Sequence, residues 1–424
     1  MNLSDVFSAV AYKRLVQVDL PGGSHQHELN GNNALRRFFE DSDIRGSIKW
    51  FYFADDRDVL TDDGLYRFYD ARAKSAERTG RTEYRMYYDG AFPAVFGDGD
   101  VLFLARPRVA ERENEIYGMA FQQGSNLLRA ASLLFAIQDA GGRFELLADE
   151  TLSAQTLEFA QQRILEELGI EVLVPERPSD ETLITDKFGM AFPTTREMSA
   201  FARTQIETDL SDPDETLVRW LRREEELFRA LERIIVQGRL DQGFATVDDF
   251  ISFSLSVHNT RKSRMGHAFE NHLAVLFDAN ALRYKHGGTT EGKNKPDFLF
   301  PGETEYKTPS FDATLLALLA AKSTCKDRWR QVLTEAARIP RKHLCTLEPS
   351  ISVAQTDEMR EQHLVLVLPT RLFATYTPGQ ARDFLNVQGF IEYVRGKQAG
   401  LPPATVIPDR RSRRGRDSGQ PSLL

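Results

Sequence analysis

Residues 293–336 read KNKPDFLFPGETEYKTPSFDATLLALLAAKSTCKDRWRQVLTEA, and this stretch decides the fold of the chain around it. It contains two apolar runs, residues 298–300 and 315–321. The first run is bounded by prolines at both ends, which predicts a short buried strand that begins beside Asp297. The second run ends at Lys322, and we interpret it as another buried strand, although apolarity alone also allows a helix there.

A helix is expected after Lys322. Residues 324–327 resemble a capping box, with Asp327 at the third helical position. The residues that follow place apolar side chains at helical spacing: Trp329, Val332, Leu333, Ala336 and Ala337. Arg328 and Glu335 are seven residues apart, so they should project from similar sides of this helix. Glu335 would then reach back toward the strand end that carries Lys322.

Asp297, Lys322 and Glu335 together suit the metal-dependent hydrolysis of a phosphodiester. Water attacks the phosphorus in line, and negative charge gathers on the oxygens around it. Two carboxylates can hold Mg²⁺ against the phosphate, and a lysine beside them can position or deprotonate the water. A single Pro-Asp pair is most often only a turn. The three residues in this order therefore predict DNA cleavage, whereas Asp297 alone does not.

Longer segments support this interpretation. Residues 259–266, 290–301 and 322–331 resemble the catalytic domain of EcoRII-type restriction endonucleases, which belong to the PD-(D/E)XK nuclease group. Residues 352–355 and 358–360 continue the resemblance in the same order, and it covers roughly residues 212–390. It implies an α/β restriction-endonuclease-like fold, in which a central mixed sheet is flanked by helices.

The resemblance also assigns roles to particular residues. The wider nuclease group places an acid two residues before the lysine, where this chain has Ala320. The EcoRII group instead takes its acid from the following helix, and Glu335 fits that position. Asp297 and Glu335 are thus expected to bind Mg²⁺, and Lys322 to activate water. Glu270 matches a further acid that would support the site or hold another metal ion, although a solvated glutamate on an amphipathic helix is an equal alternative.

Base recognition is expected next to the chemistry. Lys326, Asp327 and Arg328 follow Lys322; arginine and lysine donate to guanine, and aspartate accepts from the amino group of cytosine. By resemblance, this triplet would read a CCGG or CCWGG-like site, although Asp327 could instead only cap the helix.

Contacts to the phosphate backbone are expected from a second basic cluster: Arg261, Lys262 and Arg264. Residues 255–345 contain 15 lysines and arginines against 9 acids, which suits a DNA-binding face.

The chain has 424 residues, which suggests two or three domains. We expect a β-rich, barrel-like domain that binds DNA or an effector (1–176), a linker (177–211), the catalytic domain (212–400) and a disordered basic tail (401–424). Expected N-terminal strands are residues 49–53, 83–88, 101–105 and 143–147. The arginines Arg78, Arg81 and Arg85, interleaved with tyrosines, could face DNA. Equally, the tyrosines could pack in the core while the arginines are solvated.

Composition narrows the class of protein. With 41% hydrophobic and 27% charged residues, the chain is typical of soluble globular proteins. No apolar run reaches the ~20 residues that span a bilayer, and the N-terminus does not resemble a signal peptide, so we expect a cytoplasmic protein without membrane association. The predicted partner is double-stranded DNA, bound by a homodimer because such sites are usually palindromic.

The sequence thus predicts a Mg²⁺-dependent type II restriction endonuclease. Two alternatives remain open. One is a modification-dependent or nicking nuclease, in which the N-terminal domain reads a methylated base. The other is a catalytically silent DNA-binding regulator, which the intact set of Asp297, Lys322 and Glu335 disfavours.

Overall fold

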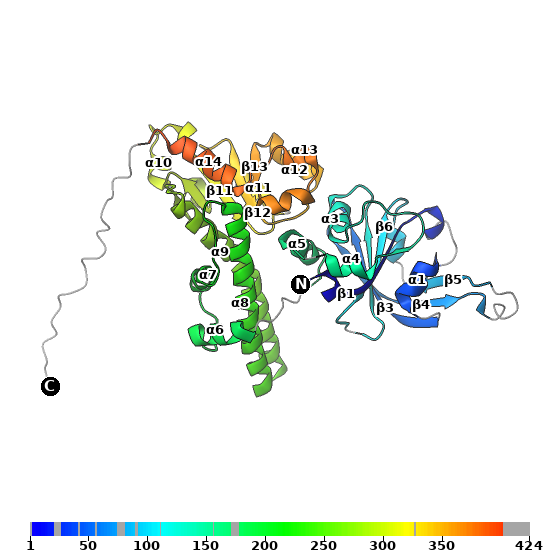
Figure 1. Ribbon diagram of the computed structural model, residues 1–424. Coiled ribbons are helices and arrows are strands. Elements are labelled where there is room, and N and C mark those ends of the chain that lie inside the picture. Colours follow the sequence, from blue (N-terminus) through cyan, green and yellow to red (C-terminus); the bar gives the residue numbers. More distant parts are fainter. Residues whose placement is uncertain are drawn as a thin grey trace, which may run out of the picture.

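The computed structural model shows a β-rich N-terminal half and an α/β C-terminal half (Figure 1). None of the described helices is both long and apolar enough to cross a membrane. The structure describes residues 2–20, 27–40, 43–55, 57–73, 81–89, 92–110, 112–155, 157–170, 178–325 and 328–401.

The N-terminal half is built on a curved eight-stranded sheet with the strand order β2-β5-β4-β3-β7-β6-β1-β8. All neighbours are antiparallel except β3 and β7, which run parallel. The strands are β1 (Phe7–Arg14), β2 (Glu28–Asn30), β3 (Asp43–Phe53), β4 (Leu60–Asp70), β5 (Tyr84–Tyr88), β6 (Val101–Pro107), β7 (Ile116–Phe121) and β8 (Glu145–Leu146). The four expected strands are confirmed, although the segment 143–147 forms only the two-residue β8.

Both faces of this sheet are buried. Along β3, Ile48 and Trp50 belong to one core and Phe51 and Phe53 to the other, as the alternation of side chains in a strand requires. Helix α1 (Asn33–Phe39) covers the first face. Helices α3 (Asn126–Leu134), α4 (Asp149–Ala154) and α5 (Phe159–Glu167) contribute to the second. The expected barrel-like domain is thus present.

The segment expected to be a linker is folded, so that part of the prediction was wrong. Helices α6 (Pro178–Phe188) and α7 (Thr195–Thr204) pack against α8 (Pro213–Gln242), where Arg223 forms a bidentate ion pair with Asp180 at 2.7 Å. The small core between them consists of Ile184, Met198, Ala202, Leu227, Phe228 and Leu231. Each short helix presents few apolar residues, and these residues are buried only because the helices pack against α8.

Helices α8 and α9 (Val247–Ala279) form a long antiparallel hairpin (Figure 1). Asp212 caps α8 by accepting from the backbone of Glu215 at 3.0 Å. Gly243, at a positive φ of 73°, ends it. Thr246 and Asp249 then form a capping box for α9.

The C-terminal half contains a five-stranded mixed sheet with the strand order β13-β12-β11-β10-β9. Strands β11, β12 and β13 run parallel, whereas β9, β10 and β11 are antiparallel. The strands are β9 (Lys285–His286), β10 (Phe298–Phe300), β11 (Ala317–Lys322), β12 (Lys342–Thr346) and β13 (Leu364–Val367). Both strands expected around the motif are therefore confirmed.

Helices cover this sheet. Phe277 of α9 and Phe390 of α14 (Val387–Gln398) both pack on Phe300 of β10. Helices α10 (Glu303–Lys307), α11 (Trp329–Leu333) and α12 (Val353–Glu361) lie between successive strands, and α13 (Pro378–Ala381) follows β13. This is the predicted mixed sheet flanked by helices.

The helix expected to carry Glu335 is much shorter than predicted. Helix α11 has five residues, no side chain caps its start at Arg328, and Glu335 lies after its end. Ala336, at a φ of 49°, turns the chain back toward β12. Lys326, Asp327 and the tail from residue 402 lie outside the described residues.

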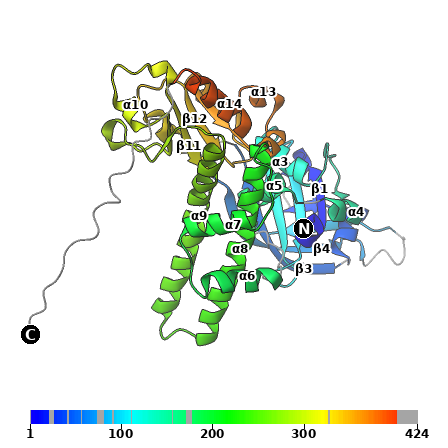
Figure 2. The ribbon, with the colours of Figure 1, turned by 60° about the vertical axis from the view of Figure 1, so that its left-hand side comes forward.

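The two halves of the chain contact each other. Asn126 of α3 donates to the carbonyl oxygen of Ile351, and Arg371 pairs with Glu158 at 2.6 Å. Figure 2 shows α3 and α5 beside the C-terminal half. These contacts place α5 near the groove described below.

Candidate active site

Asp297 and Lys322 are brought together by the antiparallel pairing of β10 with β11. Asp297 directly precedes β10, and Phe298 pairs with Leu319. The Oδ2 atom of Asp297 accepts from the backbone N–H of Ala321 at 2.7 Å and from Nζ of Lys322 at 2.9 Å. The backbone contact fixes this carboxylate at the strand end, and its charge holds the lysine beside it.

Glu335 shares the electrostatic environment of this pair. The pKa of Glu335 is raised to about 7, mainly by burial and also by the negative charge of Asp297, while Lys322 and Lys342 act in the opposite direction. Its Oε2 atom is buried, with no hydrogen-bond partner among the described residues. The three residues that the sequence singled out therefore converge on one site.

The segment that carries Glu335 is positioned by contacts with the chain before and after β10, since α11 has already ended. Glu291 accepts from the hydroxyl of Tyr306 at 2.6 Å and from the backbone of Ala337 at 3.3 Å. The guanidinium of Arg338 donates to the carbonyl oxygens of Thr308 and Phe311, at 2.9 and 2.7 Å. These bonds define the path of the chain on the C-terminal side of Glu335.

Glu270 lies on α9 and forms a 2.8 Å hydrogen bond with Nε2 of His286, on strand β9. The ring of His286 stacks on Phe298, with ring centroids 5.0 Å apart and an interplanar angle of 21°. The hydrogen bond to Glu270 raises the pKa of His286, and the charge of Asp297 adds to this effect.

Sequence analysis missed His286 and also Lys342, whose Nζ donates to the carbonyl oxygen of Ile339 at 2.9 Å. Burial lowers the pKa of Lys342, while Glu335 and Glu291 oppose the shift. A two-residue strand has no periodic pattern, so nothing in the sequence pointed to His286. Lys342 begins the next strand of the sheet, and this position at the start of a strand was the only feature of the sequence that could have identified it.

A groove of about 520 Å³ extends from this site toward the expected recognition segment. Its lining includes Lys322, Glu270 and Arg328, together with Arg163 of α5. Arg328 is exposed at the start of α11. The groove therefore connects the candidate chemistry with the one member of the recognition triplet that the structure describes.

The expected phosphate-binding cluster is only partly exposed. Arg261 has a side chain 40% exposed and pairs with Glu232 at 2.7 Å. Arg264 is 5% exposed, pairs with Glu224 and Glu225, and lies over the ring of Phe228, so its expected exposure was wrong. Both arginines line the groove. The side chain of Lys262 is outside the described set.

The N-terminal arginines show a mixed environment. Arg81 is exposed, whereas Arg85 pairs with Glu28 at 2.8 Å and with Glu83 at 2.6 Å. The adjacent tyrosines divide between the core and the surface: Tyr88 is buried and Tyr87 is exposed. Arg78 lies outside the described residues. A DNA-facing surface here stays a prediction.

The donor set at Asp297 and Glu335 suits Mg²⁺. The buried oxygen of Glu335 lacks a partner among the described residues, and a cation would satisfy it. Within the same described part of the chain, no three His, Cys, Asp or Glu residues cluster closely enough to form a complete metal cage. Magnesium is typically held by one or two carboxylates with water and substrate phosphate, so this pair fits that ion.

Comparison with known proteins agrees with the C-terminal architecture. Residues 228–391 match the family model described as EcoRII C terminal. Over this region the chain resembles EcoRII. The type II restriction enzyme EcoRII of Escherichia coli is 38% identical over 221 residues, which are 52% of this chain and 55% of that enzyme. The chain thus spans about half the length of this curated relative.

Solved structures of restriction endonucleases are also similar. Metal-depleted Ecl18kI in complex with uncleaved, modified DNA matches 53% of this chain and 86% of its own, at 19% identity and a TM-score of 0.43. The PspGI–substrate DNA complex matches 54% of this chain and 99% of its own, at 15% identity and a TM-score of 0.41. The resemblance expected from the sequence is confirmed by the family match and by EcoRII itself.

Proposed function

We propose that this chain is a Mg²⁺-dependent type II restriction endonuclease that cleaves double-stranded DNA at a short G·C-containing site. The observation that carries this proposal is the convergence of Asp297, Lys322 and Glu335, in which a buried oxygen of Glu335 has no partner among the described residues. The match of residues 228–391 to the EcoRII C-terminal family supports it.

In this mechanism Asp297 and Glu335 would hold Mg²⁺, which would offset the negative charge that develops on the phosphate. Lys322, whose Nζ lies 2.9 Å from Asp297, would orient the attacking water and, once it has released its own proton, take the proton that the water loses. As the water oxygen bonds to phosphorus, the P–O3′ bond breaks, the leaving 3′-oxygen takes a proton from solvent, and a 5′-phosphate is left. Glu270 supports the site from α9, and its bond to His286 holds its orientation.

Recognition is assigned to the groove next to this chemistry. Lys326, Asp327 and Arg328 would read G·C pairs of a CCGG or CCWGG-like sequence. Arg261 and Lys262 would contact phosphates. To do so, Arg261 must break its ion pair with Glu232. Arg264 is buried among acids and is left out of this set.

The assembly proposed is a cytoplasmic homodimer, because a two-fold protein matches a palindromic site. The N-terminal domain would bind DNA or an effector site, and Arg78, Arg81 and Arg85 are its candidate contacts. Its helix α5 lines the groove through Arg163, which gives this domain a physical route to influence cleavage.

The decisive test is cleavage of unmethylated plasmid DNA with Mg²⁺ by the wild-type chain, Lys322→Ala and the exposed-lysine control Lys187→Ala. We expect discrete fragments from the wild type and the control, and none from Lys322→Ala. Sequencing of the fragment ends would give the site and the stagger. Binding without cutting would favour the silent regulator. Cutting of methylated plasmid alone, or nicking, would favour the modification-dependent or nicking nuclease.

A further inference from the structure

Strands β11 and β12 run parallel and end at the same edge of the C-terminal sheet, where Lys322 pairs with Thr346. Each chain then continues into a segment that is neither strand nor helix. The chain after β11 leads through Cys325 to the expected recognition triplet, and the chain after β12 leads to Glu348. The two segments therefore leave the sheet together, next to the candidate active site.

A buried carboxylate joins these two segments. Glu348 is 1% exposed, and its Oε2 atom accepts from the backbone N–H of Cys325 at 2.5 Å. The carbonyl oxygen of Cys325 in turn accepts from the backbone N–H groups of Arg328 and Trp329, at 2.9 and 3.2 Å. Both polar groups of the Cys325 backbone are thus used. One fixes this residue to Glu348, and the other fixes the start of α11, where Arg328 lies.

The bond between Glu348 and Cys325 should be a strong one. A hydrogen bond to an ionised acceptor is roughly twice as strong as one between neutral groups. Cys325 is itself completely buried, so its N–H would lose its acceptor if the carboxylate were removed. A buried donor without an acceptor is costly, and the segment would have to move to find another.

The loop that carries Glu348 is itself held along its backbone. The N–H of Glu348 donates to the hydroxyl of Thr346 at 3.2 Å, and its carbonyl oxygen accepts from the hydroxyl of Tyr376 at 2.5 Å. The guanidinium of Arg163, on α5, donates to the carbonyl oxygen of Leu347 at 3.3 Å. Three different parts of the chain therefore fix the position of this carboxylate.

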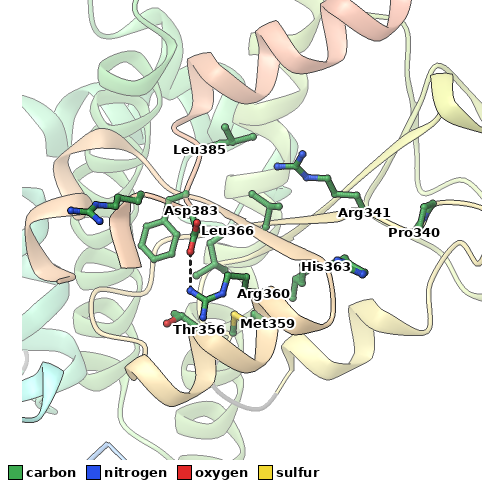
Figure 3. Close-up of a pocket in the computed structure, with 13 residues that line it drawn as sticks. Pro340, Arg341, Thr356, Met359, Arg360, His363, Leu366, Asp383 and Leu385 are labelled. Atoms are coloured by element: carbon green, nitrogen blue, oxygen red, sulfur yellow. Dashed lines mark hydrogen bonds and ion pairs between the residues drawn. The ribbon is translucent and has the colours of Figure 1, made fainter. Parts of the chain in front are cut away.

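Helix α12, which follows the loop, is anchored as well. Gln380 of α13 donates to the carbonyl oxygen of Ile351 at 3.0 Å and to the hydroxyl of Thr356 at 3.1 Å. Figure 3 shows Arg360 of α12 joined to Asp383 by an ion pair, at 3.1 Å. These contacts fix the end of the loop, so the carboxylate is held on a rigid frame.

We propose that Glu348 is a positioning residue for DNA recognition. It fixes the backbone at Cys325 and, through it, at Arg328, which are the two ends of the segment that carries the recognition triplet. Glu348 does not line the groove around Lys322, so it acts through Cys325 and does not contact DNA. The inference rests on the proposed function, in which this triplet reads the bases.

The expected effect is on sequence preference. Hydrogen bonds to the edges of bases need a defined geometry, whereas attraction to phosphates depends mainly on charge. A segment released from Glu348 should therefore still approach the DNA backbone but discriminate less between base sequences.

The first measurement uses the full chain without DNA. Hydrogen exchange of the segment 323–330 is followed by mass spectrometry. We expect about tenfold faster exchange in Glu348→Met, which keeps the size of the side chain but removes the acceptor. Glu348→Gln keeps an acceptor oxygen and should exchange like the wild type. Ser352→Ala removes the cap of α12 beside the same loop, and it is the control for a general loss of stability.

The second measurement is the affinity of the same variants, in EDTA, for a duplex with the cleaved site and for an unrelated duplex. We expect the ratio of the two affinities to fall about tenfold in Glu348→Met, and the affinity for the unrelated duplex to persist. Glu348→Gln and Ser352→Ala should keep the wild-type ratio. Calorimetric Mg²⁺ affinity should not change, because Asp297 is held by the backbone of Ala321.

Several results would overturn the proposal. One is wild-type exchange or a wild-type affinity ratio in Glu348→Met. Another is an equal loss in Glu348→Gln, because the charge and not the hydrogen bond would then be responsible. An equal loss in Ser352→Ala, or an equal loss of affinity for both duplexes, would show a role in stability alone.

The two measurements separate this proposal from the function on which it rests. If the wild type prefers no duplex, the proposed function is contradicted and the recognition role with it, whereas faster exchange in Glu348→Met would still show the anchor. Thermal unfolding verifies that each variant is folded. Glu348→Asp, which withdraws the carboxylate from Cys325 by one methylene group, replaces Glu348→Met if that variant is not folded, and the same results then decide.

Discussion

Glu335 is the residue whose environment has the clearest energetic consequence. Its folded pKa of about 7 lies above its ordinary value of 4.5, so folding favours the protonated carboxyl. The contribution of Glu335 to the stability of the metal-free protein is thus fully present below about pH 4.5 and is progressively lost as the pH rises through 7.

Replacement of this carboxyl by a neutral amide should remove that loss. In EDTA, Glu335→Gln should be more stable than the wild type by about 1–2 kcal/mol at pH 8, after allowance for solvent screening. Near pH 4.5 the difference should be small. Thermal unfolding across this range measures it, with Glu361→Gln on the exposed end of α12 as control. A constant difference at all pH values would contradict the assigned pKa.

Metal binding should show the opposite dependence on pH. Mg²⁺ requires the ionised carboxylate, so its affinity should increase up to about pH 7 and then level off. Calorimetric titration of Mg²⁺ measures this without any DNA substrate. Asp297→Asn and Glu335→Gln should each abolish the binding heat. Unchanged heat in either variant would remove that residue from the proposed ligand set.

His286 offers a test of how Glu270 is oriented. His286→Ala removes the 2.8 Å bond to Glu270, and we expect the single-turnover cleavage rate to fall about tenfold, with DNA affinity unchanged. Asn can still donate to Glu270 and should restore part of the rate. If His286→Ala cleaves at the wild-type rate, the pair has only a packing role.

Among the helices and strands, those that short-range sequence patterns determine were predicted correctly. Strands β10 and β11 were predictable because apolar runs end at prolines or at Lys322. The length of α11 was not predictable from the sequence. The spacing of the apolar residues after Lys322 fits a long helix, but it fits equally a short helix followed by the bend at Ala336. Helices α6 and α7 were not predicted because each has few apolar residues, and these form a core only together with α8. The three candidate residues were still identified correctly as neighbours.

The loop of Glu335 depends on long-range contacts, several of which Arg338 makes. Arg338→Ala removes hydrogen bonds to three backbone carbonyls, those of Tyr306, Thr308 and Phe311, and should destabilise the fold by about 1–3 kcal/mol. Because Glu335 is three residues away, Mg²⁺ affinity should fall while DNA binding persists. Denaturant unfolding and calorimetry measure the two effects. Normal Mg²⁺ affinity in Arg338→Ala would show that the loop holds Glu335 without this contact.

At the scale of the whole molecule, charge is unevenly distributed. The chain has a net charge of −8, yet its candidate DNA-binding groove is lined by Arg163, Arg229, Arg261, Arg264 and Arg328 among other residues. Several of these arginines are neutralised by acids, such as Glu225 of the groove lining beside Arg229 and the buried Glu232 beside Arg261. Arginines that contact DNA phosphates release the counterions of the DNA, so binding should weaken steeply as salt increases.

Salt dependence can therefore separate phosphate contacts from base contacts. Arg261→Ala should reduce the slope of log affinity against log salt by about one and weaken all DNA sequences equally. Arg328→Ala should instead reduce the preference for the cleaved site, by about 1–3 kcal/mol. Binding measured on site-containing and unrelated duplexes at several salt concentrations distinguishes the two. Equal behaviour of both variants would contradict the division of roles.

We propose that a loop residue, Glu335, completes the site formed by Asp297 and Lys322. Its most direct test is the Mg²⁺-dependent cleavage of unmethylated plasmid by wild type and Glu335→Gln, with DNA binding measured on the same preparations. We predict discrete fragments from the wild type, and no fragments but retained DNA binding from the variant. Cleavage by Glu335→Gln at the wild-type rate would contradict the account.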